Sequence, residues 1–160
     1  MGTRANALAE RLEQGAAKLA AFAEGLSEAE WRAPVQPDGR TVGVIIHHVA
    51  SVYPIEVQLA QRLAEGKPIS GVTMDAITSM NAQHAHDHDA STKEDTIKLL
   101  RQNSKAAADA VRLMTDEELD RAATVSLNAD APLTAQFFIE DHALRHSFHH
   151  LAKIRAALGR

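Results

Sequence analysis

The residues with the clearest chemical potential are four histidines within nine positions near the C-terminal end of the chain: His142, His146, His149 and His150. Their segment predicts a helix, in which residues three and four positions apart share a face. His146 and His150 therefore lie one turn apart and can direct two imidazoles at one point. Both fall on an otherwise apolar stripe, where unpaired polar groups are costly. A bound metal ion would explain this pair.

A third ligand is available on another predicted helix, over residues 41–65. His48 falls on its inward face with Ile45 and Val52. Three imidazoles leave coordination positions open for water or substrate, which is typical of a catalytic rather than a structural metal site. Zinc, nickel and iron all suit imidazole ligands, and zinc or nickel is the expectation. Such an ion lowers the pKa of a bound water toward about 7.

Other histidines compete for these roles. His47 is a rival to His48 but points about 100° away from the inward face. A single buried histidine is more often hydrogen-bonded to a carbonyl than bound to metal, and only the third candidate on another helix favours a metal. A second histidine cluster, over residues 84–88, alternates with acidic residues and predicts a solvated helix end. His84 and His88 would share a face if that helix continued to residue 88.

Three further polar residues are candidates for lining a pocket: Tyr53, Glu56 and Asn81. Glu56 interrupts the apolar face of its helix, so it either reaches the rim or lies near a polar pocket. Pro54 removes the usual hydrogen-bond donor to the carbonyl of Ala50, which predicts a kink close to His48. The sequence gives no defined general base and no basic cluster for a charged cofactor.

Composition excludes several classes of function. The 160 residues carry a formal net charge of −4, with 17 basic and 21 acidic residues, and no basic block indicates nucleic-acid binding. The chain has no cysteine, which excludes a disulfide framework and a thiolate nucleophile. The first residues do not resemble a signal peptide, and we expect no apolar run long enough to span a membrane. We therefore expect a cytoplasmic protein without nucleic-acid or membrane partners.

Four long amphipathic helices must position these residues. Apolar residues at alternating spacings of three and four predict helices over about residues 4–25, 41–65, 92–114 and 132–158. Pro132 fits the first turn of the last helix. Shorter features are single capped turns over residues 27–31 and 115–119, a short helix over 74–84, and at most an extended piece over 125–127.

The connection between the second and third long helices, residues 66–91, is longer than an antiparallel hairpin needs. A crossover of this length leaves those two helices parallel. The expected fold class is all-α, with one domain over residues 1–160 that forms an up-down-down-up four-helix bundle.

Two patterns, residues 41–50 (TVGVIIHHVA) and 146–155 (HSFHHLAKIR), resemble those of the DinB-like family of metalloenzymes. The likeness covers nearly the whole chain. It implies an up-down-down-up bundle in which three histidines hold a divalent metal, and those positions are matched here by His48, His146 and His150. The additional histidines at positions 47, 142 and 149 leave the register of the ligands open, with His142 and His146 as the alternative pair.

Families related to the DinB-like proteins include mycothiol-dependent maleylpyruvate isomerases and bacillithiol or mycothiol S-transferases, and dimers are common among them. The resemblance therefore implies a metal-dependent enzyme, a thiol S-transferase or a related hydrolase, that acts on a small thiol or electrophile as a homodimer. In this mechanism the metal holds the thiol as a thiolate nucleophile. The alternatives are a non-catalytic metal-binding or stress-related dimeric bundle, and a metal-free bundle with hydrogen-bonded core histidines.

Overall fold

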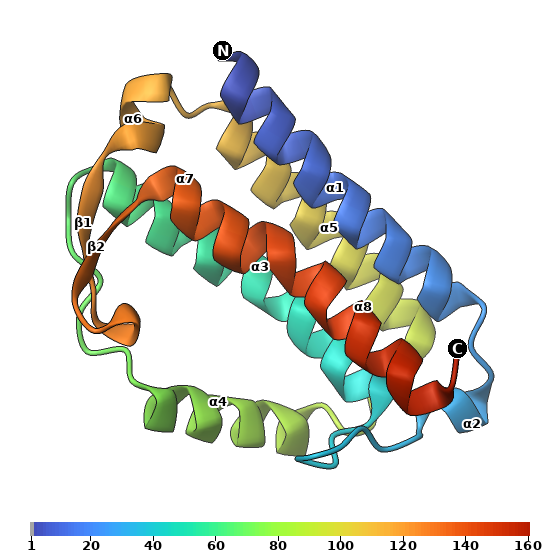
Figure 1. Cartoon of the computed structure of the whole chain (residues 1–160). Coiled ribbons are helices and arrows are strands. Elements are labelled where there is room, and N and C mark those ends of the chain that lie inside the picture. Colours follow the sequence, from blue (N-terminus) through green and yellow to red (C-terminus); the bar gives the residue numbers. More distant parts are fainter. Residues whose placement is uncertain (1) are drawn as a thin grey trace.

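Capping residues and hydrophobic spacing define the long helices of the computed structural model, which describes residues 2–160 (Figure 1). α1 spans Thr3–Glu24, α3 spans Val42–Ala64 and α5 spans Lys93–Arg112. The side chains of Thr41 and Thr92 accept hydrogen bonds from the first turns of α3 and α5, which fixes where these helices begin. The fourth helical rod consists of three consecutive segments: α7 (Ala135–Phe138), a π-helical segment (Ile139–Leu144) and α8 (Arg145–Leu158).

The shorter helices lie in the connections. α2 (Glu28–Trp31) and α6 (Asp116–Asp120) each begin with a capping box, as the sequence predicts. α4 (Met74–Asp87) crosses the outside of the bundle, three residues longer than expected.

A two-stranded antiparallel hairpin precedes the last helical rod. β1 (Ala122–Val125) pairs with β2 (Ala131–Thr134), and a 3-10 turn follows β1 over Ser126–Asn128. The prediction that Pro132 opens the last helix is wrong, because Pro132 lies in β2 opposite Thr124. The helix begins only after Thr134, whose side chain accepts a hydrogen bond from the backbone N–H of Phe137. Proline is tolerated in β2 because a strand with one neighbour leaves half of its N–H groups unpaired.

The four long helices have the expected up-down-down-up order. Lys93, at the start of α5, donates to the carbonyl of Leu26 just beyond the end of α1, so these two helices are antiparallel. Arg4, at the start of α1, pairs with Asp120 beyond the end of α5. Figure 1 shows α3 running in the same direction as α5, and α8 in the same direction as α1. The crossover through α4 makes this parallel arrangement of α3 and α5 possible.

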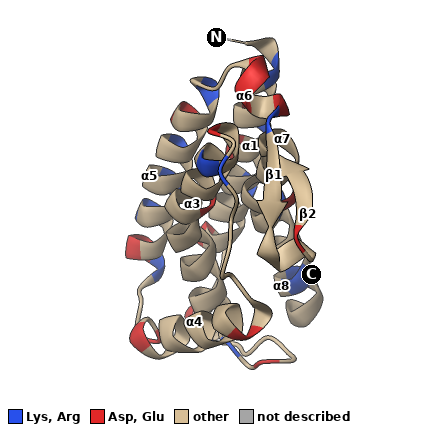
Figure 2. Ribbon diagram, turned by 90° about the vertical axis from the view of Figure 1, so that its left-hand side faces the viewer, with Lys and Arg blue, Asp and Glu red and all other residues tan. Residues whose placement is uncertain are grey.

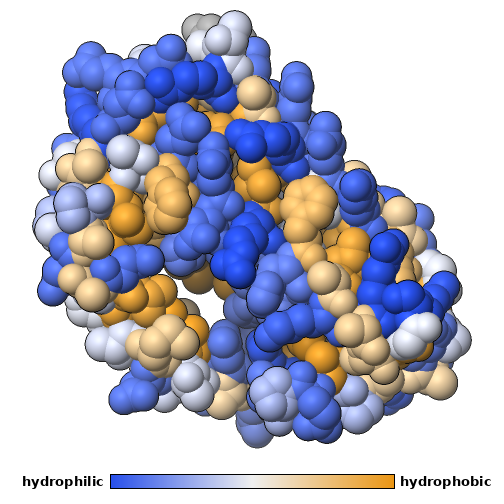
Figure 3. All heavy atoms as spheres, in the orientation of Figure 1, coloured by the Kyte–Doolittle hydropathy of each residue, from blue (hydrophilic) through white to orange (hydrophobic). Residues whose placement is uncertain are grey.

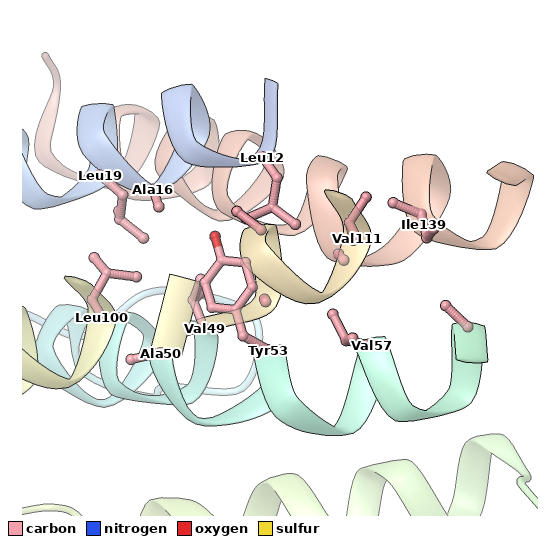
Figure 4. Packing of buried hydrophobic residues seen from close by; sticks show 14 of the residues in the cluster. Leu12, Ala16, Leu19, Val49, Ala50, Tyr53, Val57, Leu100, Val111 and Ile139 are labelled. Carbon is pink, nitrogen blue, oxygen red and sulfur yellow. The ribbon is translucent and has the colours of Figure 1, made fainter. Parts of the chain in front are cut away.

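The core lies between α1, α3, α5 and the last helical rod (Figure 4). Leu12, Leu19, Tyr53 and Leu100 are among its fully buried side chains. Pro54 leaves the carbonyl of Ala50 without its helical donor, and Nδ2 of Asn103 on α5 donates to that carbonyl at 2.9 Å. The core therefore includes a side-chain hydrogen bond that replaces a missing backbone one.

α3 is apolar because it is the central helix of the bundle. Within residues 2–160 it is the one helix whose length and composition would also allow it to cross a membrane, so the expectation that no apolar run is this long is wrong. Of its most apolar window, 56% is buried inside the bundle. Basic and acidic residues are scattered over the side of the molecule that Figure 2 displays.

Candidate metal centre

Three histidines from two helices direct the same ring atom at a common point. Nε2 of His146 lies 3.2 Å from Nε2 of His48 and 2.9 Å from Nε2 of His150. His48 and His150 are each only 8% exposed. The structure therefore brings together the three residues that helical periodicity selects as ligands.

Hydrogen bonding alone cannot satisfy this arrangement. A neutral imidazole nitrogen either carries one hydrogen or presents one lone pair. Nε2 of His146 can therefore serve only one of its two neighbours well. A cation that accepts three lone pairs satisfies all of them. Two nitrogen ligands bound to one ion at about 2.0–2.1 Å lie roughly 3 Å apart, so the observed separations fit a metal ion.

Burial keeps the three rings in the neutral form that binds metal. Loss of solvent lowers the pKa of His48 to about 3, of His146 to about 4 and of His150 to about 2. The guanidinium of Arg40 contributes a smaller part of each of these shifts. The lone pairs are thus available at neutral pH.

The helices hold these rings by local geometry. His146 and His150 are four residues apart in α8, directly after the π-helical segment, and such segments are frequent at functional sites. Ser147, which is fully buried, shares a short hydrogen bond with the hydroxyl of Tyr53 on α3. This contact fixes α8 against α3 beside the histidines. Loss of solvent raises the pKa of Tyr53, so its hydroxyl stays protonated.

Glu56 lies behind the histidines, not at the rim. Its Oε1 is 3.3 Å from Nδ1 of His146, the ring nitrogen that faces away from the other two histidines. Its Oε2 is buried and has no hydrogen-bond partner among the described residues. Burial raises the pKa of this carboxyl to about 8. A carboxylate behind a histidine is the usual partner of a metal-binding imidazole.

The alternative ligands do not reach this centre. His142 stacks on Phe138, with ring centroids 4.2 Å apart, and its Nε2 faces Asp141 at 3.7 Å. The ring of His149 lies beside that of His150, with centroids 5.3 Å apart, and His149 is not in the group of converging ligand atoms. His47 directs its ring toward His84 of α4. The alternative pair of His142 and His146 therefore does not form.

The interpretation of residues 84–88 as a solvated helix end is wrong for two of its three histidines. α4 continues to Asp87, so His84 and His88 share a face and are half-buried against α3. His86 is exposed and contacts Asp87. Asn81 is half-buried on the same side of α4.

Sequence reasoning missed Arg40, which lies just before α3. Nε of Arg40 donates to Asp38 at 2.8 Å, while its Nη1 is buried and has no hydrogen-bond partner within residues 2–160. The basic character of one loop residue was the only signal in the sequence. A free guanidinium donor beside neutral histidines can bind an anion. Figure 3 shows an opening between α4 and the bundle.

Comparison with known proteins places this site in a family. The model of the DinB superfamily matches residues 11–154. The chain is similar to the solved structure of YfiT from Bacillus subtilis, described as a probable metal-dependent hydrolase with an unusual four-helix bundle topology (TM-score 0.74, 19% identity, 98% of this chain and 87% of that chain covered). It is also similar to a mycothiol-dependent maleylpyruvate isomerase (TM-score 0.70, 13% identity, 96% of this chain and 63% of that chain covered).

No curated protein matches the chain. At these identities the two solved structures show a shared fold, which confirms the expected four-helix bundle. The family match is independent of that likeness and covers most of the sequence. The chain belongs to the DinB superfamily.

Proposed function

We propose that this protein is a metal-dependent enzyme in which His48, His146 and His150 hold a divalent ion that activates a nucleophile. The observation that carries the proposal is the convergence of three Nε2 atoms on one point, two of them from buried side chains. Within residues 2–160, no carboxylate or further histidine joins this group as a fourth ligand. Open coordination positions support a catalytic over a structural role. Zinc or nickel is the proposed ion, because both suit imidazole ligands.

When bound, the ion supplies Lewis acidity, which lowers the pKa of a water or a thiol. The protein's own residues do the rest. Oε1 of Glu56 faces Nδ1 of His146 at 3.3 Å and so favours the orientation of that ring in which Nε2 points inward. Tyr53 and Ser147 lock α3 against α8, so the imidazoles keep their spacing. The free Nη1 of Arg40 offers a hydrogen bond to an anionic group of the substrate.

The nucleophile we propose is a small thiol, and the reaction is its transfer to an electrophile. One structural neighbour is named as mycothiol-dependent, which supports a thiol as one reactant. In such a transfer the thiol proton leaves to solvent and a sulfur–carbon bond forms. The leaving group departs with the electron pair of the bond that breaks. Hydrolysis, in which water replaces the thiol, is the second form of the same chemistry and is supported by the name of the other neighbour.

The first experiment is elemental analysis of untagged protein, with His146→Ala and His150→Ala beside the wild type. Both variants should lose one equivalent of metal. His142→Ala and His149→Ala are matched controls, because they remove histidines of the same helical rod that do not reach the centre; both should keep it. Equal metal content in His150→Ala and His149→Ala would refute the site.

The second experiment measures turnover in the metal-loaded protein. Glutathione, bacillithiol and mycothiol are each offered with 1-chloro-2,4-dinitrobenzene, and p-nitrophenyl acetate is offered without a thiol. Loss of turnover in His150→Ala but not in His149→Ala supports the enzyme. Metal binding without turnover in any pair would favour the non-catalytic metal-binding bundle. A cytoplasmic location and a homodimer remain predictions. Light scattering would test the dimer by measuring the molar mass in solution.

A further inference from the structure

A second group of three histidines lies beside the candidate metal centre. It consists of His47 on α3 with His84 and His88 on α4. Nδ1 of His47 is 2.8 Å from Nε2 of His84. The ring of His88 lies 4.1 Å from that of His47 and 4.6 Å from that of His84, measured between centroids. One potential ligand atom from each residue falls within 4.8 Å of the others.

The polar contacts around this group leave nitrogen atoms unsatisfied. Ser51 donates its hydroxyl to the carbonyl of His47, and its oxygen, 3.2 Å from Nδ1 of the same residue, can accept from that nitrogen only when Nδ1 carries the hydrogen. Nδ1 of His84 is buried and has no hydrogen-bond partner in the described part of the chain. Asp87, the nearest acid along α4, is hydrogen-bonded to Gln83 and His86. Three imidazoles without a carboxylate partner are a donor set for a metal ion.

The group also holds α4 against the bundle. Among residues 74–87 none is fully buried, and Met74 and Met80 are 64% and 58% exposed. Figure 1 shows α4 lying apart from the long helices, beside the opening that Figure 3 displays. His84 and His88 thus form contacts with α3 at the end of an otherwise loosely packed helix.

The two histidine groups are neighbours. His47 and His48 are consecutive in α3, and the rings of His48 and His84 lie 5.8 Å apart, edge to face. An ion held by the second group would therefore lie next to the first centre and fix α4 beside it.

We propose that His47, His84 and His88 form a second divalent-cation site that clamps α4 over the metal centre. Three nitrogen ligands select borderline first-row ions such as Zn²⁺, Ni²⁺ or Cu²⁺ over Mg²⁺ and Ca²⁺, which prefer oxygen. The contact between His47 and His84 already has the spacing of two ligands. His88 follows α4 as its C-cap residue and now stacks on the ring of His47, so its ring must turn to complete the set. The site does not depend on the proposed enzyme activity.

The test is the zinc stoichiometry of untagged protein, measured by elemental analysis after dialysis against micromolar Zn²⁺. The wild type should hold two equivalents. His84→Ala and His88→Ala should each hold one, with a further site at least tenfold weaker in competition with a chromophoric chelator. His86→Ala is the matched control, because His86 lies on the same helix but faces solvent, and it should hold two.

A separate measurement tests whether a bound ion holds α4 in place. Amide hydrogen exchange over residues 74–87 should slow when zinc is added to wild-type protein and to His86→Ala, but not to His88→Ala. Identical stoichiometry in His84→Ala and His86→Ala, or exchange over residues 74–87 that zinc does not slow in wild-type protein, would overturn the proposal. In His150→Ala, which lacks a ligand of the first centre, zinc should still slow amide exchange over residues 74–87. That result would support the second site even if the protein showed no enzyme activity.

Discussion

Oε1 of Glu56 lies 3.3 Å from Nδ1 of His146, so a buried carboxyl on α3 stands directly behind an imidazole of α8. The other nitrogen of that ring, Nε2, is the one that meets His48 and His150. Burial makes ionisation of Glu56 unfavourable and raises its pKa to about 8. A cation on the far side of the ring would favour the carboxylate, because it strengthens the Nδ1 hydrogen as a donor.

Replacing Glu56 with Gln should therefore weaken metal binding by about 10- to 100-fold, the usual effect of removing such a partner. The affinity is measured by competition with a chromophoric chelator. Glu65→Gln is the control, because Glu65 caps the end of the same helix and is exposed, and it should bind metal like the wild type. Equal affinities for the two variants would show that Glu56 does not support the site.

The hydrogen bond from Asn103 to the carbonyl of Ala50 predicts a stability difference. Asn103→Ala should lower the free energy of unfolding by about 1–3 kcal/mol, because it leaves a fully buried carbonyl unpaired. Denaturant unfolding measures the change. Gln102→Ala, an exposed neighbour, should have little effect.

Pro54 provides the sharper version of this experiment. In a Pro54→Ala background the backbone N–H of residue 54 can again donate to Ala50. The cost of Asn103→Ala should then fall below its cost in the wild type, which a double-mutant cycle measures. The same cost in both backgrounds would mean that Asn103 does not replace the missing backbone donor.

Local signals were enough to predict the long helices and the three converging histidines. Thr41 and Thr92 cap α3 and α5, and the spacing of apolar residues identifies the buried faces. His146 and His150 were predictable because their spacing within one helix is a local property, and His48 because it lies on the apolar face of its own helix. Whether these residues bind metal still awaits the measurement proposed above.

Features that depend on long-range packing were not predictable in this way. Ile55 lies one turn after Val52, on the face predicted to point inward, yet it is 44% exposed. Tyr53 and Val57 turn inward there instead. The hairpin of β1 and β2 exists through pairing between segments too short to signal strands alone. The meeting of His47 with His84 depends on where the crossover places α4, which periodicity cannot show.

Replacing Gly43 with alanine should lower the stability of the protein strongly, although it adds only a methyl group. A Cβ at this position would overlap the indole of Trp31, which is buried and donates its Nε1 hydrogen to the carbonyl of Ser91. Gly43→Ala should therefore destabilise the protein by about 2–3 kcal/mol through overpacking. Gly25→Ala is the control, because Gly25 has φ −83° and its added Cβ would meet only Phe22 O at 3.7 Å. It should be neutral or stabilising by up to about 1 kcal/mol in thermal or denaturant unfolding.

Metal-free protein should lose stability steeply as the pH falls below 6.5. His48, His146 and His150 have pKa values of about 3, 4 and 2 in the folded protein, against 6.5 for an ordinary histidine. The unfolded chain therefore binds more protons below pH 6.5, and stability is present above that pH and declines as the pH falls toward the folded values.

For one such histidine the decline between pH 7 and pH 5 is about 2 kcal/mol. Urea unfolding of chelator-treated protein at several pH values measures it. His150→Gln removes one titrating ring and should make the slope shallower, whereas His86→Ala removes an exposed ring and should not change it. A slope that is the same in the wild type and His150→Gln would mean that His150 is not buried as a neutral ring. That outcome would also remove the reason for its lone pair to be available to a metal at neutral pH.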